Sequence, residues 1–258
     1  MSTAEIVSFT AAGLALGSFL NLTIDRLPRQ QSIIHPPSHC DGCQRRLTPV
    51  DLVPLASYLW LRGQCRKCGY RIPMRVPAVE AMTGAACGLA AYLYGWTPAA
   101  AVLALYFAVF IHLAFVDLEH SLILNVVVLP ALLVVLATAP LGPLGQNLGS
   151  GEAYLRSLAG AGLGFGVMLL VYLASRGRVG AGDVKLAALL GAMLGFPQII
   201  AGLLLGFVAG GVLGATLLML RLKRRTDAIP YGPVLVASAA VALITGSSIY
   251  DWYLNLFW

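Results

Sequence analysis

Two aspartates, Asp117 and Asp183, lie where long apolar stretches meet polar sequence, and the second stands in Gly180-Ala181-Gly182-Asp183-Val184-Lys185. An ionisable side chain at a membrane boundary is energetically expensive, so it is a candidate functional group. Two carboxylates that face one another can share a proton, so that one acts as a base on water and the other as an acid. The pair predicts the chemistry of an aspartyl protease.

Four cysteines form a second candidate site, in the Cys-x-x-Cys pairs Cys40/Cys43 and Cys65/Cys68. Each pair folds a tight turn that presents two thiolates, and two such turns complete a tetrahedral zinc site. Two disulfides are the alternative, but the topology below puts this segment in the reducing cytoplasm, where stable disulfides are rare. Four thiolates leave no open position for catalysis, so we expect a structural zinc ion.

The elements that position these residues are expected to be membrane-spanning helices. The chain of 258 residues is 59% hydrophobic and only 11% charged, whereas soluble domains carry about 25% charged residues. One span needs about 20 apolar residues, so the stretches between charges predict an all-α polytopic membrane protein with eight spans. These are one in 6–24, two in 81–116 with a turn at 95–98, one at about 122–139, one in 157–175, two in 186–220 with a turn at 195–198, and one in 228–250.

The basic residues set the orientation of these spans. Sixteen of the 17 Lys and Arg residues fall in 26–75, 176–185 and 221–225, which share one side of the membrane if there are eight spans. Basic residues concentrate on the cytoplasmic side, so we expect these segments in the cytoplasm and both termini outside. The net charge of +6 is therefore expected to serve orientation in the membrane and contact with anionic lipid. No nucleic-acid partner is expected.

The same pattern divides the chain into three expected parts. Residues 1–24 form the first transmembrane helix, 25–79 a cytoplasmic zinc-binding insert, and 80–258 a transmembrane domain with both aspartates. An insert of this size buries little apolar core, so a metal is expected to stabilise it.

The predicted topology places both aspartates near the cytoplasmic face. Asp117 ends the third span and Asp183 begins the sixth, so the two carboxylates lie at similar depth. A helix C-terminus favours a protonated Asp117, whereas a helix N-terminus with Lys185 nearby favours an ionised Asp183. We therefore expect Asp117 to hold the shared proton and Asp183 to activate water. The alternative is two interfacial residues that are exposed to water or paired with Arg.

Other residues have supporting roles in this interpretation. Gly180 and Gly182 permit close backbone approach and leave room for an extended peptide. Glu80 is expected to open the second span, where a carboxylate suits the helix dipole, with a substrate contact as the alternative. His112 is expected to pack within its helix, with an influence on Asp117 as the alternative.

The chain resembles the type IV prepilin peptidase family, the bifunctional leader peptidase/N-methyltransferases of pilus and type II secretion systems. The resemblance covers nearly the whole chain. The motifs that carry it are Gly17-Ser18-Phe19-Leu20-Asn21 with Arg26-Leu27-Pro28, the two Cys-x-x-Cys pairs, Arg75-Val76-Pro77 with Glu80, Phe115-Val116-Asp117-Leu118-Glu119-His120 with Leu122-Ile123-Leu124-Asn125, and the run from Gly180 to Lys185.

The resemblance implies that Asp117 and Asp183 are catalytic. It implies a bacterial inner-membrane enzyme that cleaves the basic leader of prepilins and pseudopilins at the cytoplasmic face. It also implies N-methylation of the new N-terminus with S-adenosylmethionine, although spacing identifies no residues that bind this cofactor. The family often has Pro-Asp where this chain has Leu124-Asn125, which concentrates the catalytic role on Asp117.

Two other functions would account for the same aspartates and cysteines. In a transporter, the aspartates would carry protons or cations. In an assembly scaffold, the zinc insert would act without catalysis. The aspartates lie at expected helix ends rather than at the bilayer midplane, and no inverted repeat is evident in the hydropathy. Both observations favour the peptidase over the transporter.

Overall fold

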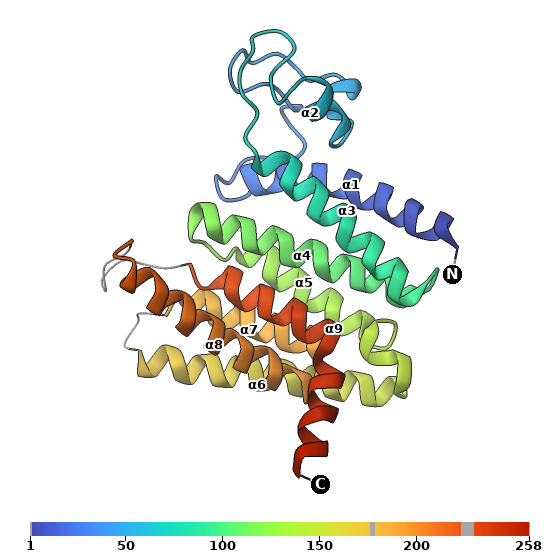
Figure 1. The fold of residues 1–258 in the computed structure, drawn as a ribbon, viewed down its shortest axis with the longest axis vertical. Helices are drawn as coiled ribbons and strands as arrows, with labels where there is room; N and C mark the ends of the chain where they lie inside the picture. The colour runs from blue at the N-terminus through green and yellow to red at the C-terminus, as the bar shows by residue number, and fades with distance from the viewer. Residues whose placement is uncertain (1, 176–178, 223–229, 258) are drawn as a thin grey trace. The chain divides into compact units, whose positions relative to one another are not determined.

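The computed structural model describes residues 2–175, 179–222 and 230–257, and it describes the side chains of these residues apart from Asn147 and 246–257. Within these residues the chain is helical and contains isolated β-bridges but no β-strand (Figure 1). The elements are α1 (Thr3–Arg26), η1 (Pro49–Leu52), α2 (Ala56–Trp60), α3 (Arg75–Tyr94), α4 (Pro98–His120), α5 (Asn125–Thr138), η2 (Pro143–Asn147), α6 (Ser150–Ala174), α7 (Ala181–Leu194), α8 (Gln198–Met219) and α9 (Gly232–Phe257), where η denotes a 3₁₀ helix.

Each of the eight expected spans contains one of these helices. Six apolar segments of the described chain are long enough to cross a membrane, namely α1, α3, α4, Asn125–Gln146, α6 and α8. The 14 residues of α7 extend about 21 Å, which is less than the ~30 Å of a bilayer's hydrocarbon core. This agrees with the few residues available between Lys185 and the turn expected at 195–198. The prediction of an all-α polytopic membrane protein is confirmed.

Two glycines end helices at the predicted turns. α3 stops at Tyr94 and α7 at Leu194, and the next residues, Gly95 and Gly195, have φ of 65° and 71°. This left-handed conformation costs glycine little because it has no Cβ, and it turns the chain out of the helix. Of the basic residues used for the orientation, Arg176, Arg178, Lys223, Arg224 and Arg225 lie outside the described residues.

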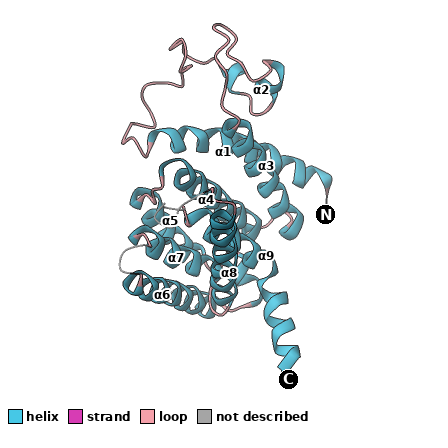
Figure 2. Cartoon of the chain, turned by 60° about the vertical axis from the view of Figure 1, so that its left-hand side comes forward, coloured by secondary structure: helices cyan, strands magenta, loops and turns pink. Residues whose placement is uncertain are grey.

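The chain forms two compact units, Met1–His112 and Leu113–Trp258, whose boundary falls inside α4. The division into 1–24, 25–79 and 80–258 stays a prediction. In the first unit α1 packs along α3, and most of the insert between them is loop (Figure 2). Gly13 makes this approach possible, since a Cβ there would lie 2.7 Å from the Cβ of Cys87. Cys87 therefore lies at the contact between α1 and α3.

The two ends of the insert are fastened to each other. Arg75 Nη2 lies 2.8 Å from both carboxylate oxygens of Asp25. One turn earlier in α1, Asn21 Nδ2 donates to the carbonyl of Val76 at 3.0 Å. These contacts hold the C-terminal end of α1 against the first residues of α3.

In the second unit, small residues bring α6 against α7 and α8 against α9. The backbones of Gly160 on α6 and Gly191 on α7 approach so closely that a Cβ on either residue would overlap the backbone carbonyl of the other. Ser157 Oγ also donates to the carbonyl of Ala192 at 2.8 Å. On α8, a Cβ at Gly206 would lie 3.0 Å from Leu235 of α9. Close approach of this kind is how helices pack in lipid, and it fixes the helices that carry the candidate site.

Candidate active site and metal centre

Asp117 lies in the last turn of α4 and is only 5% exposed. Its Oδ2 accepts a hydrogen bond from the backbone N–H of Gly232 at 3.0 Å, across 115 residues of sequence. Gly232 begins α9, and a Cβ there would lie 2.6 Å from the same carboxylate oxygen. Only glycine therefore leaves room for this contact.

Asp183 is the third residue of α7 and is 8% exposed. Its Oδ2 accepts the backbone N–H of Gly180 at 3.2 Å, in the manner of an N-terminal capping box. A carboxylate at this position also interacts favourably with the positive end of the helix dipole. The local sequence thus holds Asp183 at the start of α7 without help from another element.

The two carboxylates lie near enough for the charge of Asp117 to act on Asp183. In each of them Oδ2 accepts a backbone N–H. The elements that carry them also meet, since a Cβ at Gly182 would lie 2.9 Å from Ile123, in the loop after α4. This contact gives Gly182 a packing role that the sequence did not predict. Room for an extended peptide stays a prediction.

Tyr231 is a neighbour of this site that the sequence analysis missed. Its hydroxyl is buried without a hydrogen-bond partner among the described residues, and its ring packs against Gly210 of α8, as a Cβ there would meet it. Its phenol is close enough to interact with the charge of Asp183. The run Pro230-Tyr231-Gly232-Pro233 before the last span was the available signal, because Gly and Pro next to an apolar segment mark a special backbone position.

Lys185 makes a hydrogen bond that the sequence did not predict. Its Nζ donates to Asn125 Oδ1 at 3.0 Å, so its ammonium joins the start of α5 to the first turns of α7. Its influence on the charge of Asp183 stays a prediction. Asn125 is the residue at which the chain departs from the family's common Pro-Asp.

Glu80 does not open its helix, because α3 begins five residues earlier at Arg75. The prediction of a first-turn carboxylate that complements the helix dipole is therefore wrong. Glu80 is instead 5% exposed, and its Oε2 accepts the backbone N–H of Leu55 at 2.8 Å. It thus connects the insert to the span. His112 is buried in α4, and neither ring nitrogen has a hydrogen-bond partner among the described residues.

The four insert cysteines form one cluster, in which all ligand atoms lie within 4.8 Å of one another. All four are free thiols, and Cys40 Sγ lies 3.8 Å from Cys68 Sγ. Zinc–sulfur bonds of about 2.3 Å in a tetrahedron require sulfurs about 3.8 Å apart, whereas a disulfide needs about 2.05 Å. The cluster can hold a metal ion.

The backbone around the two Cys-x-x-Cys pairs repeats one pattern. Cys40 N–H donates to Arg45 at 2.9 Å, and Cys65 N–H donates to Tyr70 at 2.8 Å. The backbone N–H groups of Cys68 and Lys67 point at the Cys65 sulfur and lower the pKa of its thiol to about 6. Metal ligation requires thiolates, so this turn prepares Cys65 to bind a cation.

A polytopic helical membrane protein with two buried, interacting aspartates and a four-cysteine cluster is the class that these observations define. Comparison with known proteins gives the family. Residues 11–94 match the Bacterial Peptidase A24 N-terminal domain, and residues 103–215 match the Type IV leader peptidase family. The chain belongs to the type IV leader peptidase family.

Relatives match over almost the full length. The chain is 30% identical to the Prepilin leader peptidase/N-methyltransferase of Bacillus subtilis (strain 168) over 244 residues, which cover 95% of this chain and 96% of that protein. It is 34% identical to the protein of the same name from Aeromonas hydrophila, covering 95% and 92%, and 30% identical to that of Pseudomonas aeruginosa, covering 94% and 91%. No solved structure matches the chain.

Proposed function

We propose that this protein cleaves the leader peptide of type IV prepilins and pseudopilins and methylates the new N-terminus. The observation that carries the peptidase is the pair of buried, interacting carboxylates on α4 and α7. Membership of the family and the shared name of relatives covered over more than nine tenths of their length support both activities. The membrane-length apolar helices and the family support a location in the bacterial inner membrane.

The proposed catalytic step uses Asp183 and Asp117 as base and acid. Asp183, at a helix N-terminus, takes a proton from water as the water oxygen attacks the peptide carbonyl carbon. Asp117 gives its proton to the carbonyl oxygen, which forms a tetrahedral diol. As the C–N bond breaks, the leaving nitrogen takes the proton from Asp183, and a diol hydroxyl returns a proton to Asp117. The N–H groups of Gly180 and Gly232 hold one oxygen of each carboxylate in place.

The charge distribution supports an active site at the cytoplasmic face with both termini outside. Of the basic residues of the chain, nine lie in residues 26–75, as positive-inside orientation requires. A prepilin inserted as a helix in the same bilayer would present its leader on this side. The exposed Glu119, two residues from Asp117, adds negative charge that attracts a basic leader.

The four-cysteine cluster is proposed to bind structural zinc through Cys40, Cys43, Cys65 and Cys68. Zinc bound there would link the two turns of a small insert and would supply folding stability rather than chemistry. S-adenosylmethionine is the proposed methyl donor. The described residues contain no glycine-rich turn between a strand and a helix, so we assign no residue to its binding.

One measurement tests the proposed function directly. Purified protein in detergent is incubated with a prepilin and S-adenosylmethionine, and the product is weighed by mass spectrometry. We expect loss of the leader and a gain of about 14 Da, which is one CH₂. An unprocessed substrate would refute the peptidase, and a truncated product without the added mass would refute the methyltransferase alone.

Replacing Gly232 with Ala should lower the rate of prepilin cleavage at least about tenfold, since a misplacement of about 1 Å can cost about 10²-fold in rate. The added methyl would lie 2.6 Å from Asp117 Oδ2 and displace the carboxylate. The matched control is Gly211→Ala on α8, where nothing lies within 4 Å of the new Cβ. Equal cleavage by the two variants would contradict the positioning role of Gly232.

A further inference from the structure

The insert exposes large apolar side chains in η1, in α2 and between them. The five residues Val50, Leu52, Val53, Leu59 and Trp60 form what we call the η1–α2 surface. Leu59 is 73% exposed and Trp60 85%. η1 and α2 also contact each other, so these side chains belong to one local structure. Exposed apolar residues gathered in this way mark contacts with another protein or with a membrane.

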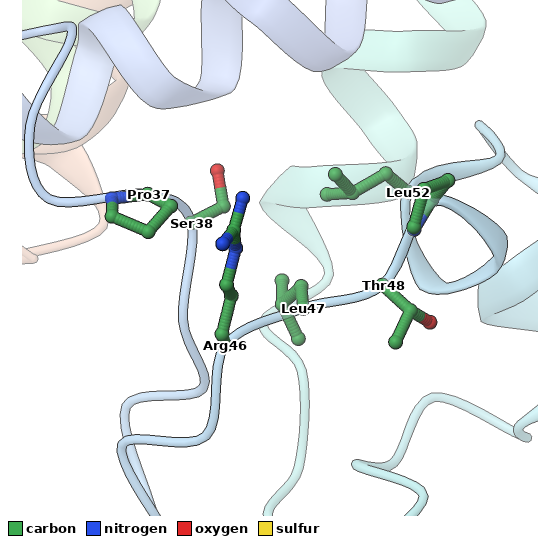
Figure 3. Close-up of a pocket in the computed structure, with 7 residues that line it drawn as sticks. Pro37, Ser38, Arg46, Leu47, Thr48 and Leu52 are labelled. Atoms are coloured by element: carbon green, nitrogen blue, oxygen red, sulfur yellow. The ribbon is translucent and has the colours of Figure 1, made fainter.

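An open cleft of about 420 Å³ borders this surface and shares Leu52 with it (Figure 3). Its other lining residues are Pro37, Ser38, Arg46, Leu47, Thr48 and Pro49. Arg46 is the only charged residue among them, and its side chain extends along the cleft in Figure 3. The walls of the cleft are mostly apolar and carry one positive charge, which suits a partner that is both apolar and anionic.

The net positive charge of the insert also favours an anionic partner. Residues 25–75 contain nine Lys and Arg residues against three acids, Asp25, Asp41 and Asp51, and Asp25 is paired with Arg75 at 2.8 Å. Asp51 is already paired, with Arg45 at 2.7 Å and Arg66 at 3.3 Å. Although desolvation raises the pKa of Asp51, the Thr48 N–H and hydroxyl and these two cations hold it below its usual value. Most of the basic charge therefore remains for a partner.

A hydrogen bond holds the start of α2 beside the N-terminal part of α3. Leu55, which precedes α2, donates its N–H to Glu80 of α3 at 2.8 Å. Glu80 lies five residues beyond Arg75, the first residue of α3, which is about 7.5 Å along the helix. Because α3 is long and apolar enough to cross a membrane and each headgroup layer is about 5–8 Å thick, a bilayer whose surface lies at Arg75 would bring the start of α2 to the boundary between headgroups and hydrocarbon.

We propose that the η1–α2 surface is an interfacial anchor that seats the insert on the adjoining leaflet, with anionic phospholipid as its partner. Tryptophan prefers the membrane–water interface, and the neighbouring Leu59 adds apolar contact with the acyl boundary. The exposed Arg62, Lys67 and Arg71 of the same insert add positive charge that would attract lipid phosphates. The anchor keeps the zinc-binding insert close to the membrane, and it does not depend on the proposed peptidase activity.

Trp60 itself reports on the anchor. The full-length protein with Trp96, Trp252 and Trp258 replaced by Phe has Trp60 as its single tryptophan, and it is reconstituted in nanodiscs of phosphatidylcholine and phosphatidylglycerol. Lipids brominated at carbons 6 and 7 should quench its fluorescence by at least about half, as for a shallow interfacial tryptophan. Acrylamide should quench it at least about threefold less than free N-acetyltryptophanamide in water.

Two other results would overturn the proposal. Strong acrylamide quenching with no effect of brominated lipid would place Trp60 in water. Protection from both quenchers would mean that protein, a second copy or another surface, covers it. The variant Leu59→Ser with Trp60→Ser gives a second readout, since trypsin should cut the insert at least about fivefold faster in anionic nanodiscs once the anchor is lost.

The matched control is Ile33→Ser with Ile34→Ser. These side chains belong to the same insert and are also exposed, at 41% and 75%. Their replacement should leave the trypsin rate within about twofold, because they lie outside the η1–α2 surface. Equal acceleration by both double variants would show a general loosening of the insert and would refute the anchor.

Discussion

Replacing either Asp117 or Asp183 with Asn should reduce prepilin cleavage at least about 10³-fold, because an amide can neither accept the proton of water nor donate an acidic proton. Each change keeps the size of the side chain and its acceptor oxygen, so the hydrogen bonds from Gly232 and Gly180 can persist. The measurement is the rate at which a prepilin loses its leader, followed by mass. Zinc content and helix content should stay at the values of the unchanged protein.

The near control is Glu119→Gln. This carboxylate lies two residues from Asp117 but is exposed rather than buried, and we propose that it attracts the leader. Its loss should raise KM and leave the rate at saturating substrate within about threefold, because this attraction stabilises the bound substrate and the transition state equally. Full cleavage by Asp117→Asn or Asp183→Asn would remove that aspartate from the proposed mechanism.

Replacing Cys65 with Ser should bring the zinc content from one ion per chain to near zero. Cys65 is the ligand whose thiolate the backbone favours most clearly, and structural zinc sites contribute about 10–16 kcal/mol of apparent binding free energy in small domains. Without the metal the insert should unfold locally, while the spans stay folded in lipid. Zinc is measured by elemental mass spectrometry, and the opening of the insert by its rate of cleavage with trypsin.

Cys87→Ala is the control for this change, because Cys87 is buried between α1 and α3 and belongs to no cysteine cluster. It should keep one zinc ion and the trypsin resistance of the insert. Unchanged zinc in the Cys65→Ser protein would mean that the four thiols are not the binding site. A chelator applied to the unchanged protein should reproduce the Cys65→Ser result.

The spans were predictable from the sequence because lipid imposes a simple demand on each of them. A helix must be apolar over its membrane-spanning length, so the spacing between charges such as Glu80 and Asp117 limits where spans can lie. Gly95 and Gly195 then mark the turns after α3 and α7, since their backbone conformation favours glycine. The four-cysteine cluster was equally predictable, because each Cys-x-x-Cys pair is local in sequence and a tetrahedral metal site needs four ligands.

The surroundings of the aspartates were less predictable because they depend on contacts between distant segments. The pairing of Gly232 with Asp117 joins residues 115 positions apart, and no periodicity in one sequence encodes such a contact. Lys185 donates to Asn125, which lies 60 residues away in the chain, and the local sequence does not encode this contact either. Glu80 was misplaced because α3 extends beyond its apolar stretch to Arg75.

The ion pair between Asp25 and Arg75 has a consequence for how this chain tolerates change. It closes a loop of 49 intervening residues at its base, and the entropy of loop closure grows only slowly with length, by about 0.6 kcal/mol for each doubling. Segments of different length can therefore be grafted between these two residues while the α1–α3 hairpin keeps its geometry. The insert is in this sense an exchangeable module, and any substitute would have to keep the ion pair between Asp25 and Arg75 at its base.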